Sequence, residues 1–159
     1  MNRAEHIAAL RIASDAPAGG ERLQLPDWSD ADWNKLLDCT QARAFHTTEM
    51  VIKGGATDRA LYFVVAGALE VGISQVDGVS ISTLAKITAG SVIGEQSFFD
   101  GQPRSANVWA VADGELLRLE FDDYSRFGKE QPALARDLLF ALARVLSARL
   151  RNTTFRVRR

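Results

Sequence analysis

The chain of 159 residues is long enough for one domain with a substantial core, and its 47% apolar and 25% charged residues are typical of a soluble globular protein. The formal net charge of −1 gives no reason to expect a polyanionic partner. The single cysteine, Cys39, cannot form an internal disulfide and favours a reducing compartment. Glu5 and His6 interrupt the apolar N-terminus, and the longest apolar run, Leu61–Leu69, is too short to span a bilayer. We therefore expect a cytoplasmic protein without a membrane segment.

The first part of the chain is expected to divide into an N-terminal arm, residues 1–27, and the start of a domain over residues 28–159. Asn2–Ala13 has the pattern of a short helix within this arm. A clearer helix follows, because Ser29 is a good N-cap ahead of an apolar helical face. This second helix should end near Cys39.

The middle of the chain has the apolar pattern of β-strands. Leu61–Val65 has the β-branched and aromatic content of a buried strand, and Ala66-Gly67 is expected to turn before the next strand. Gln75–Gly78 predicts a hairpin. Eight or so short strands at close spacing predict a mainly β fold with flanking helices, a double-stranded β-helix or jelly roll.

The chain becomes helical after residue 121. A short helix is expected to close at Gly128, and Pro132 suits the first position of a long helix. Asn152–Thr154 should loosen that helix, and the arginines near the end are more typical of a solvated terminus than of a nucleic-acid contact. An apolar stripe along the long helix permits pairing with a second subunit, or packing on the roll of its own chain; it comprises Leu138, Leu142, Val145 and Leu146.

The most informative stretch is Gly94–Ala106. Gly94 allows a tight turn, and one helical turn after it would offer backbone N–H groups to an anion. Arg104 adds a bidentate fork suited to phosphate, and Ser105 adds a hydroxyl and an N–H. Glu95 is an anion and is better suited to accept from a sugar hydroxyl. An acid for a sugar and an arginine for a phosphate, within one loop, indicate a nucleotide.

This stretch resembles the phosphate-binding cassette of the cyclic nucleotide-binding domain family, which includes the effector domain of the catabolite activator protein and the regulatory subunits of protein kinase A. The matching residues are Gly94, Glu95, Ser97, Phe98, Arg104, Ser105 and Ala106. Gln96 departs from the pattern, since the family usually has an apolar residue there. The order of elements over roughly residues 29–154 resembles the same fold, with the long helix as a lid.

The resemblance implies a role for each matching position. Arg104 would pair with the cyclic phosphate, together with Ser105 and the backbone of Ala106. Glu95 would accept from the ribose 2′-hydroxyl, with the Gly94 backbone shaping its approach. Gln96 and Ser97 would complete the loop around the ligand.

Two further groups of residues correspond more loosely to the family's binding site. By order along the fold, Val71 and Leu84 fall where apolar residues wall the base, although ordinary core positions would look the same. Arg149–Thr154 resembles a central-helix segment that covers adenine, which implies ligand contacts for Arg149, Thr153 and Thr154. A threonine near a helix end can equally bond its own backbone.

Other kinds of site lack support in the sequence. The two histidines, His6 and His46, are far from the cassette, which argues against a cupin-type metal site. No Ser-His-Asp set or P-loop is evident. We expect a non-catalytic module without a cofactor that binds cyclic AMP or cyclic GMP and signals to an unknown protein partner. A homodimer through the long helix is a further hypothesis.

Two alternatives come from other classes of protein. One is a structural or protein-interaction domain that kept the fold and lost the ligand; a complete cassette argues against it. The other is a fragment of a transcription regulator. Family members that regulate genes carry a helix-turn-helix domain after the long helix, and the few residues after Thr154 leave no room for one. DNA binding is therefore not expected.

Overall fold

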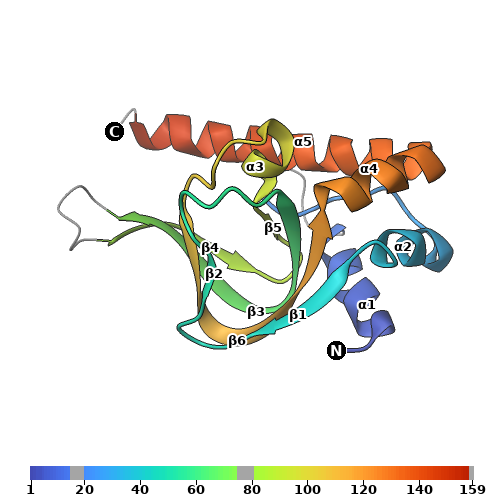
Figure 1. The fold of residues 1–159 in the computed structure, drawn as a ribbon, viewed down its shortest axis with the longest axis horizontal. Coiled ribbons are helices and arrows are strands. Elements are labelled where there is room, and N and C mark those ends of the chain that lie inside the picture. The colour runs from blue at the N-terminus through green and yellow to red at the C-terminus, as the bar shows by residue number, and fades with distance from the viewer. Residues whose placement is uncertain (15–19, 75–80, 158–159) are drawn as a thin grey trace.

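A computed structural model describes residues 1–14, 20–74 and 81–157. Within these residues six strands form one antiparallel sheet of order β1-β6-β3-β4, with β2 added on β6 and β5 on β3, and the sheet curls into a roll (Figure 1). The strands are β1 (Gln41–Phe45), β2 (Met50–Ile52), β3 (Ala60–Ser74), β4 (Ile81–Thr88), β5 (Val92–Ile93) and β6 (Asn107–Glu120). The helices are α1 (Arg3–Ser14), α2 (Asp30–Leu37), α3 (Glu95–Asp100), α4 (Phe121–Glu130) and α5 (Pro132–Val157).

The two longest strands, β3 and β6, form the central pair of the roll. They pair from Ala60 opposite Glu120 to Gly72 opposite Asn107, with register shifts around residues 64–69. The predicted turn at Ala66-Gly67 is wrong: it is an irregularity inside β3, where Gly67 has φ 84° and a Cβ would lie 2.6 Å from the Asp113 carbonyl oxygen. A glycine can bend a strand without ending it, so the sheet has fewer and longer strands than expected.

The mainly β jelly roll with C-terminal helices is nevertheless confirmed. The predicted hairpin Gln75–Gly78 lies outside the described residues. The strands on either side of it, β3 and β4, pair antiparallel.

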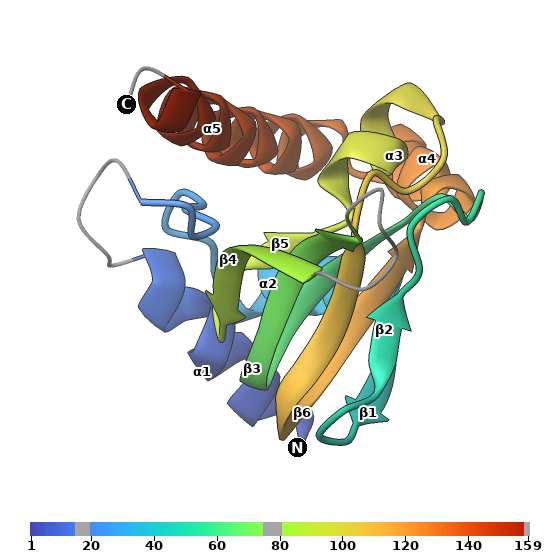
Figure 2. The ribbon, with the colours of Figure 1, turned by 90° about the vertical axis from the view of Figure 1, so that its left-hand side faces the viewer.

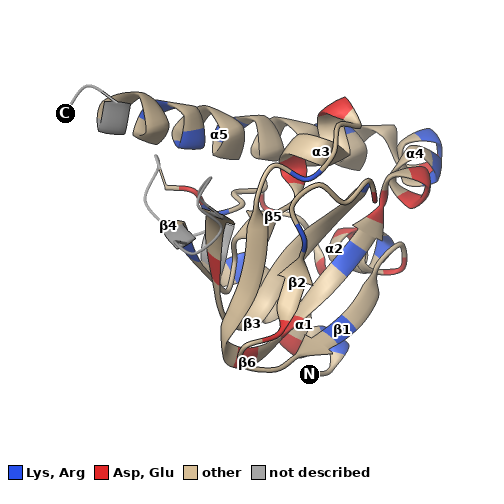
Figure 3. Ribbon diagram, turned by 60° about the vertical axis from the view of Figure 1, so that its left-hand side comes forward, with Lys and Arg blue, Asp and Glu red and all other residues tan. Residues whose placement is uncertain are grey.

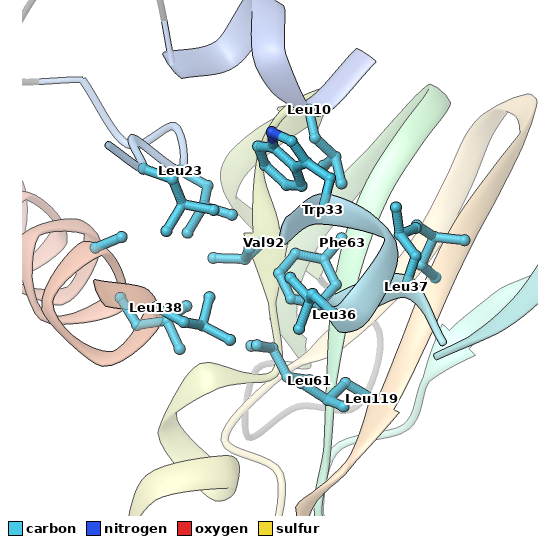
Figure 4. Close-up of a cluster of buried hydrophobic side chains, with 14 of the residues drawn as sticks. Leu10, Leu23, Trp33, Leu36, Leu37, Leu61, Phe63, Val92, Leu119 and Leu138 are labelled. Atoms are coloured by element: carbon cyan, nitrogen blue, oxygen red, sulfur yellow. The ribbon is translucent and has the colours of Figure 1, made fainter. Parts of the chain in front are cut away.

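Alternate residues of β3 serve two separate apolar cores, as the two-residue period of a strand requires. Tyr62 and Val64 point into the roll, whereas Leu61 and Phe63 point outward to a core covered by helices. Figure 4 shows this outer core, in which side chains from the arm, α1, α2 and α5 converge on the sheet; those labelled are Leu10, Leu23, Trp33, Leu36, Leu37, Leu61, Phe63, Val92, Leu119 and Leu138. The inner core leaves the mouth of the roll free for a pocket.

Local sequence signals account for the starts of α2 and α5. The predicted N-cap is present, because the Ser29 hydroxyl accepts from the Asp32 backbone N–H and the Asp32 side chain accepts in return from Ser29. Pro132 begins α5 as predicted. The predicted end at Gly128 is wrong, since α4 continues to Glu130; glycine weakens a helix but does not oblige it to stop.

The predicted loosening of α5 at Asn152–Thr154 is also wrong, because the helix continues to Val157. The hydroxyls of Thr153 and Thr154 donate to the backbone carbonyls four residues earlier, at 3.0 and 2.9 Å. These bonds are compatible with a helix, which explains why the polar run does not interrupt it.

The apolar stripe of α5 packs on its own chain. Leu138, Leu142 and Val145 are fully buried against the outer core, and Leu146 is partly buried. Of the two alternatives, packing on the roll is therefore the one observed, and it covers Leu138, Leu142 and Val145.

The helix of the N-terminal arm is packed against the domain. Ile7 and Leu10 join the outer core, and the His6 Nε2 atom lies 2.5 Å from a Glu115 carboxylate oxygen. The Arg3 guanidinium pairs with Asp38 at 2.7 Å. The boundary at residue 27 stays a prediction. Across the described ranges, no helix is both long enough and apolar enough for a bilayer crossing.

Candidate functional site

A pocket lies at the mouth of the roll, beside α3 and the second half of α5. It is lined by every predicted site residue except Thr154: Val71, Leu84, Gly94, Glu95, Gln96, Ser97, Arg104, Ser105, Ala106, Arg149 and Thr153. It also has lining residues that were not predicted: Glu21, Ile52, Ala85, Ile87, Ile93, Val108 and Asn152. The cassette and the second half of the long helix therefore meet at one cavity.

The short helix α3 is bounded by two glycines in the left-handed backbone conformation and is anchored by buried side chains. Gly94 before it has φ 81° and Gly101 after it has φ 68°. Phe98 is buried and packs edge-on against Phe121 and Tyr124, each with ring centroids 5.5 Å away. Because L-residues with a side chain rarely adopt positive φ, glycines at both ends give the helix its short, fixed length.

Gly94 also permits a close approach that no other residue would allow. A Cβ on Gly94 would lie 2.5 Å from the Arg104 Nη1 atom and 2.8 Å from the Ala60 carbonyl oxygen. Arg104 fills this space and donates from Nη1 to the Gly94 carbonyl oxygen at 3.0 Å. The first and last parts of the cassette are thus in direct contact.

Arg104 is buried, with 4% of the residue exposed, and four hydrogen bonds hold its guanidinium. Its Nη2 donates to Asp58 Oδ2 at 2.5 Å and to the Ala60 carbonyl at 2.9 Å, and its Nε donates to Asp58 Oδ1 at 3.2 Å. The hydrogen bonds from Arg104 lower the pKa of the Asp58 carboxyl despite its partial burial. Asp58 was not predicted, because an aspartate in a glycine-rich turn carries no signal beyond that of the turn itself.

Glu95, the predicted ribose acceptor, is also buried, with 5% of the residue exposed. Its Oε1 atom lies 2.6 Å from Nη1 of Arg149 on α5. Arg149 further donates to the Val92 carbonyl at 2.7 Å, and its Nε donates to Glu21 at 3.3 Å. The acid of the cassette is therefore already connected to the long helix.

The two threonines differ in position. Thr153 lines the pocket and Thr154 does not, and both hydroxyls bond their own helix. The neighbouring Asn152 also lines the pocket, and its side-chain amide donates to Glu21 Oε1 at 2.7 Å. The resemblance of residues 149–154 to the family's central helix implied ligand contacts for the two threonine hydroxyls and not for the Asn152 amide. No sequence pattern in the arm identified Glu21 as a pocket residue.

The apolar wall of the pocket comes from strands of the roll. Val71 packs against the inner core, whereas Leu84 on β4 is 38% exposed. Ile87 on β4 and Val108 on β6 are buried and line the same wall. The alternation of β4 could have identified Ile87, which is on the same strand face as Ala85.

A family model for the cyclic nucleotide-binding domain matches residues 42–131, more than half of the chain. The chain belongs to the cyclic nucleotide-binding domain family. The match includes the whole cassette and the turn that contains Asp58. Among the residues that the structure describes, no group of three or more His, Cys, Asp or Glu is placed to hold a metal ion.

Two curated relatives contain a matching region within longer chains. The cyclic AMP receptor protein of Thermus thermophilus is 34% identical over 110 residues, which are 69% of this chain and 50% of that protein. The cAMP-dependent protein kinase type II regulatory subunit of Drosophila melanogaster is 32% identical over 93 residues, 58% of this chain and 23% of that subunit. The chain thus spans half or less of the length of these relatives.

A solved structure shows the same fold over nearly the full chain. It is a cyclic nucleotide-binding domain from Methylobacillus flagellatus, with a TM-score of 0.78 and 25% identity, covering 94% of this chain and 84% of that one. The likeness extends well beyond the 42–131 match.

Proposed function

We propose that this chain is a non-catalytic cyclic nucleotide sensor that binds cyclic AMP in preference to cyclic GMP. One observation carries the proposal: a buried arginine, Arg104, and a buried acid, Glu95, flank Gly94 at the wall of one pocket. A buried cation suits a phosphate, and a buried acid suits a hydroxyl donor. A ribose cyclic phosphate carries both groups.

The proposed ligand contacts follow from this arrangement. Arg104 takes the cyclic phosphate and keeps Asp58 as its counter-ion, while Ser105 and Ala106 present backbone N–H groups and Ser105 its hydroxyl. Glu95 accepts the ribose 2′-hydroxyl on the oxygen that Arg149 leaves free. Gln96 and Ser97 complete the loop, and Val71 and Leu84 contact the base.

Cyclic AMP is the proposed nucleotide for two reasons. The relatives described above include a cyclic AMP receptor protein and a cAMP-dependent regulatory subunit. In addition, Thr153 and Arg149 lie on the pocket side of α5, where a base would be covered. Thr154 would contribute only if α5 turned on ligand binding.

The proposed output is a movement of α5, which would present a changed surface to an unknown protein partner in the cytoplasm. A homodimer through α5 remains a separate hypothesis. Since the predicted stripe is buried, the dimer would have to use other apolar side chains of α5 that face solvent, such as Phe140 and Leu150, which are 63% and 69% exposed. Light scattering over a range of concentrations tests it, and a monomer throughout would reject it.

The test of ligand binding is a calorimetric titration of the purified protein with cyclic AMP, cyclic GMP and cyclic dinucleotides. We expect saturable binding of cyclic AMP at one site per chain, with slower amide exchange across residues 149–154 at saturation. Absence of binding by every nucleotide would favour the structural or protein-interaction alternative. Salt-dependent binding of duplex DNA would instead favour the regulator fragment.

A further inference from the structure

Glu21 lies at the rim of the pocket, in the segment that follows α1, and holds two side chains of α5. Its Oε1 accepts from the Asn152 amide at 2.7 Å and its Oε2 accepts from the Arg149 Nε at 3.3 Å. Residues three apart lie on the same face of a helix. One carboxylate therefore holds both neighbouring side chains at the pocket.

The guanidinium of Arg149 joins four segments of the chain. Its Nε contacts Glu21 of the arm, its Nη2 donates to Val92 on β5, and its Nη1 pairs with Glu95 on α3. The side chain of Arg149 is 19% exposed and that of Glu95 is 7% exposed. Because the guanidinium is planar and its donors have a fixed geometry, a displacement at one of these contacts changes the other two.

The segment that carries Glu21 is fixed to the roll. Arg22 forms an antiparallel bridge with Ser91, and the Leu23 N–H donates to the Gly90 carbonyl at 3.0 Å. Leu23 is 1% exposed and belongs to the outer core (Figure 4). Figure 2 shows this segment passing between α1 and α5. Glu21 therefore occupies a defined place beside β5.

We propose that Glu21 is a positioning residue of the ligand site, which acts through Arg149 and Asn152 and couples the N-terminal arm to occupancy of the pocket. This inference rests on the proposed function. A ribose hydroxyl that donates to Glu95 spreads the charge of that carboxylate over a second partner and weakens its hold on Arg149. Glu21 is the other carboxylate in contact with Arg149, so the arginine and the helix that carries it shift toward the arm.

The first part of the test needs no ligand. NMR of the Arg149 Nε–H signal, assigned by its loss in Arg149→Lys, reports the contact with Glu21 directly. We expect slow hydrogen exchange at this site in the wild type and loss of that protection in Glu21→Ala, which removes both acceptor oxygens. An unchanged signal in Glu21→Ala would overturn the assigned contact.

The second part is a cyclic AMP titration in a double-mutant cycle. Glu21→Gln should weaken binding about 2- to 5-fold, as expected for a partly exposed ion pair, and should have no further effect in the double variant Arg149→Ala/Asn152→Ala, which lacks both of its partners. Asp30→Asn is the matched control, because it breaks the exposed contact of Arg11 with Asp30 at 2.8 Å, which also involves the arm but is remote from the pocket. It should leave affinity unchanged.

The outcomes separate this inference from the function on which it rests. Equal losses from Glu21→Gln in both backgrounds, or no loss in the wild type, would refute the positioning role. A wild-type protein that binds no cyclic nucleotide would overturn the proposed function and the coupling together. In that case the Nε–H measurement alone would still decide whether Glu21 holds Arg149.

Discussion

The two arginines of the pocket, Arg104 and Arg149, are both paired with carboxylates, yet they are held in different ways. The Arg104 side chain is 2% exposed, and its partners Asp58, Gly94 and Ala60 all belong to the roll. Arg149 is 19% exposed and extends from α5, where Figure 3 shows basic positions spaced along the helix, to contact three other segments. Arg104 is thus a buried part of the pocket wall, whereas Arg149 connects α5 to the arm, β5 and α3.

Under the proposed function, this difference would assign ligand binding to Arg104 and the response of α5 to Arg149. A preorganised cation is ready for its ligand, because little ordering remains to be done on binding. A cation shared among several segments responds to a change at any of them. Substitutions at the pocket should separate the two roles, from the largest expected effect to the smallest.

Removal of the buried arginine should have the largest effect. A hydrogen bond to a charged group contributes about 1.5–3 kcal/mol, so Arg104→Ala should weaken cyclic AMP binding about 10- to 150-fold in calorimetry. Arg43→Ala is the control, since Arg43 pairs with Glu49 outside the ligand pocket and should keep wild-type affinity. A folded Arg104→Ala protein with unchanged affinity would remove Arg104 from the phosphate site.

The close approach at Gly94 can be separated from its backbone conformation. Gly94→Ala combines a strained φ of 81° with a clash against Arg104, whereas Gly55→Ala has a similar φ of 82° and no atom within 4 Å of the added carbon. A strained backbone costs about 1–3 kcal/mol, so both variants should melt earlier. Only Gly94→Ala should also lose affinity, because it displaces Arg104. Equal affinity in the two variants would mean that this contact does not support the site.

The role of Glu95 can be tested with the ligand as well as with the protein. If Glu95 accepts the 2′-hydroxyl, 2′-deoxy cyclic AMP should bind the wild type more weakly, because an unpaired buried acceptor costs about 1–3 kcal/mol. Glu95→Gln should discriminate less between the two ligands. The assignment fails if the wild type binds both ligands equally in a competition titration.

The smallest effect is expected at the end of α5. Thr153→Val should lower the preference for cyclic AMP over cyclic GMP by about 2- to 10-fold, the range of a neutral hydrogen bond, while phosphate binding is spared. Thr154→Val is the matched control, because Thr154 makes the same backbone bond outside the pocket. If the two variants behave alike in the two titrations, Thr153 does not contact the base in the bound state.

Sequence reasoning was most successful where a residue's role depends on its near neighbours. The cap at Ser29 and the start of α5 at Pro132 are local patterns, and both are confirmed. The cassette is local as well, and Glu95 and Arg104 line one pocket, while their contacts with a ligand stay a prediction. The errors at Gly67 and Gly128 have a common cause. Glycine permits a turn or a helix end, but pairing with β6 and packing of α4 on α5 decide whether one occurs.

The missed residues depend on contacts between distant parts of the chain. Asp58 and Arg104 are separated by 46 positions, and Glu21 and Arg149 by 128. In their own segments, Asp58 and Glu21 look like ordinary solvated acidic residues, because nothing nearby in the sequence indicates that an arginine will lie beside them. The stripe of α5 posed the same difficulty: its spacing suits a second helix and the sheet equally well, and only the fold distinguishes them.

The pairing of Ala60 with Glu120 has a consequence for how the protein acquires its binding site. The cassette lies within the loop that this pairing closes, and contacts between distant residues form slowly because chain entropy must be lost first. Gly94 and Arg104 meet beside Ala60, so their geometry depends on the closed roll. We therefore expect an isolated peptide of residues 94–106 to have no affinity for the nucleotide. In refolding experiments, ligand binding should appear only with the final cooperative phase.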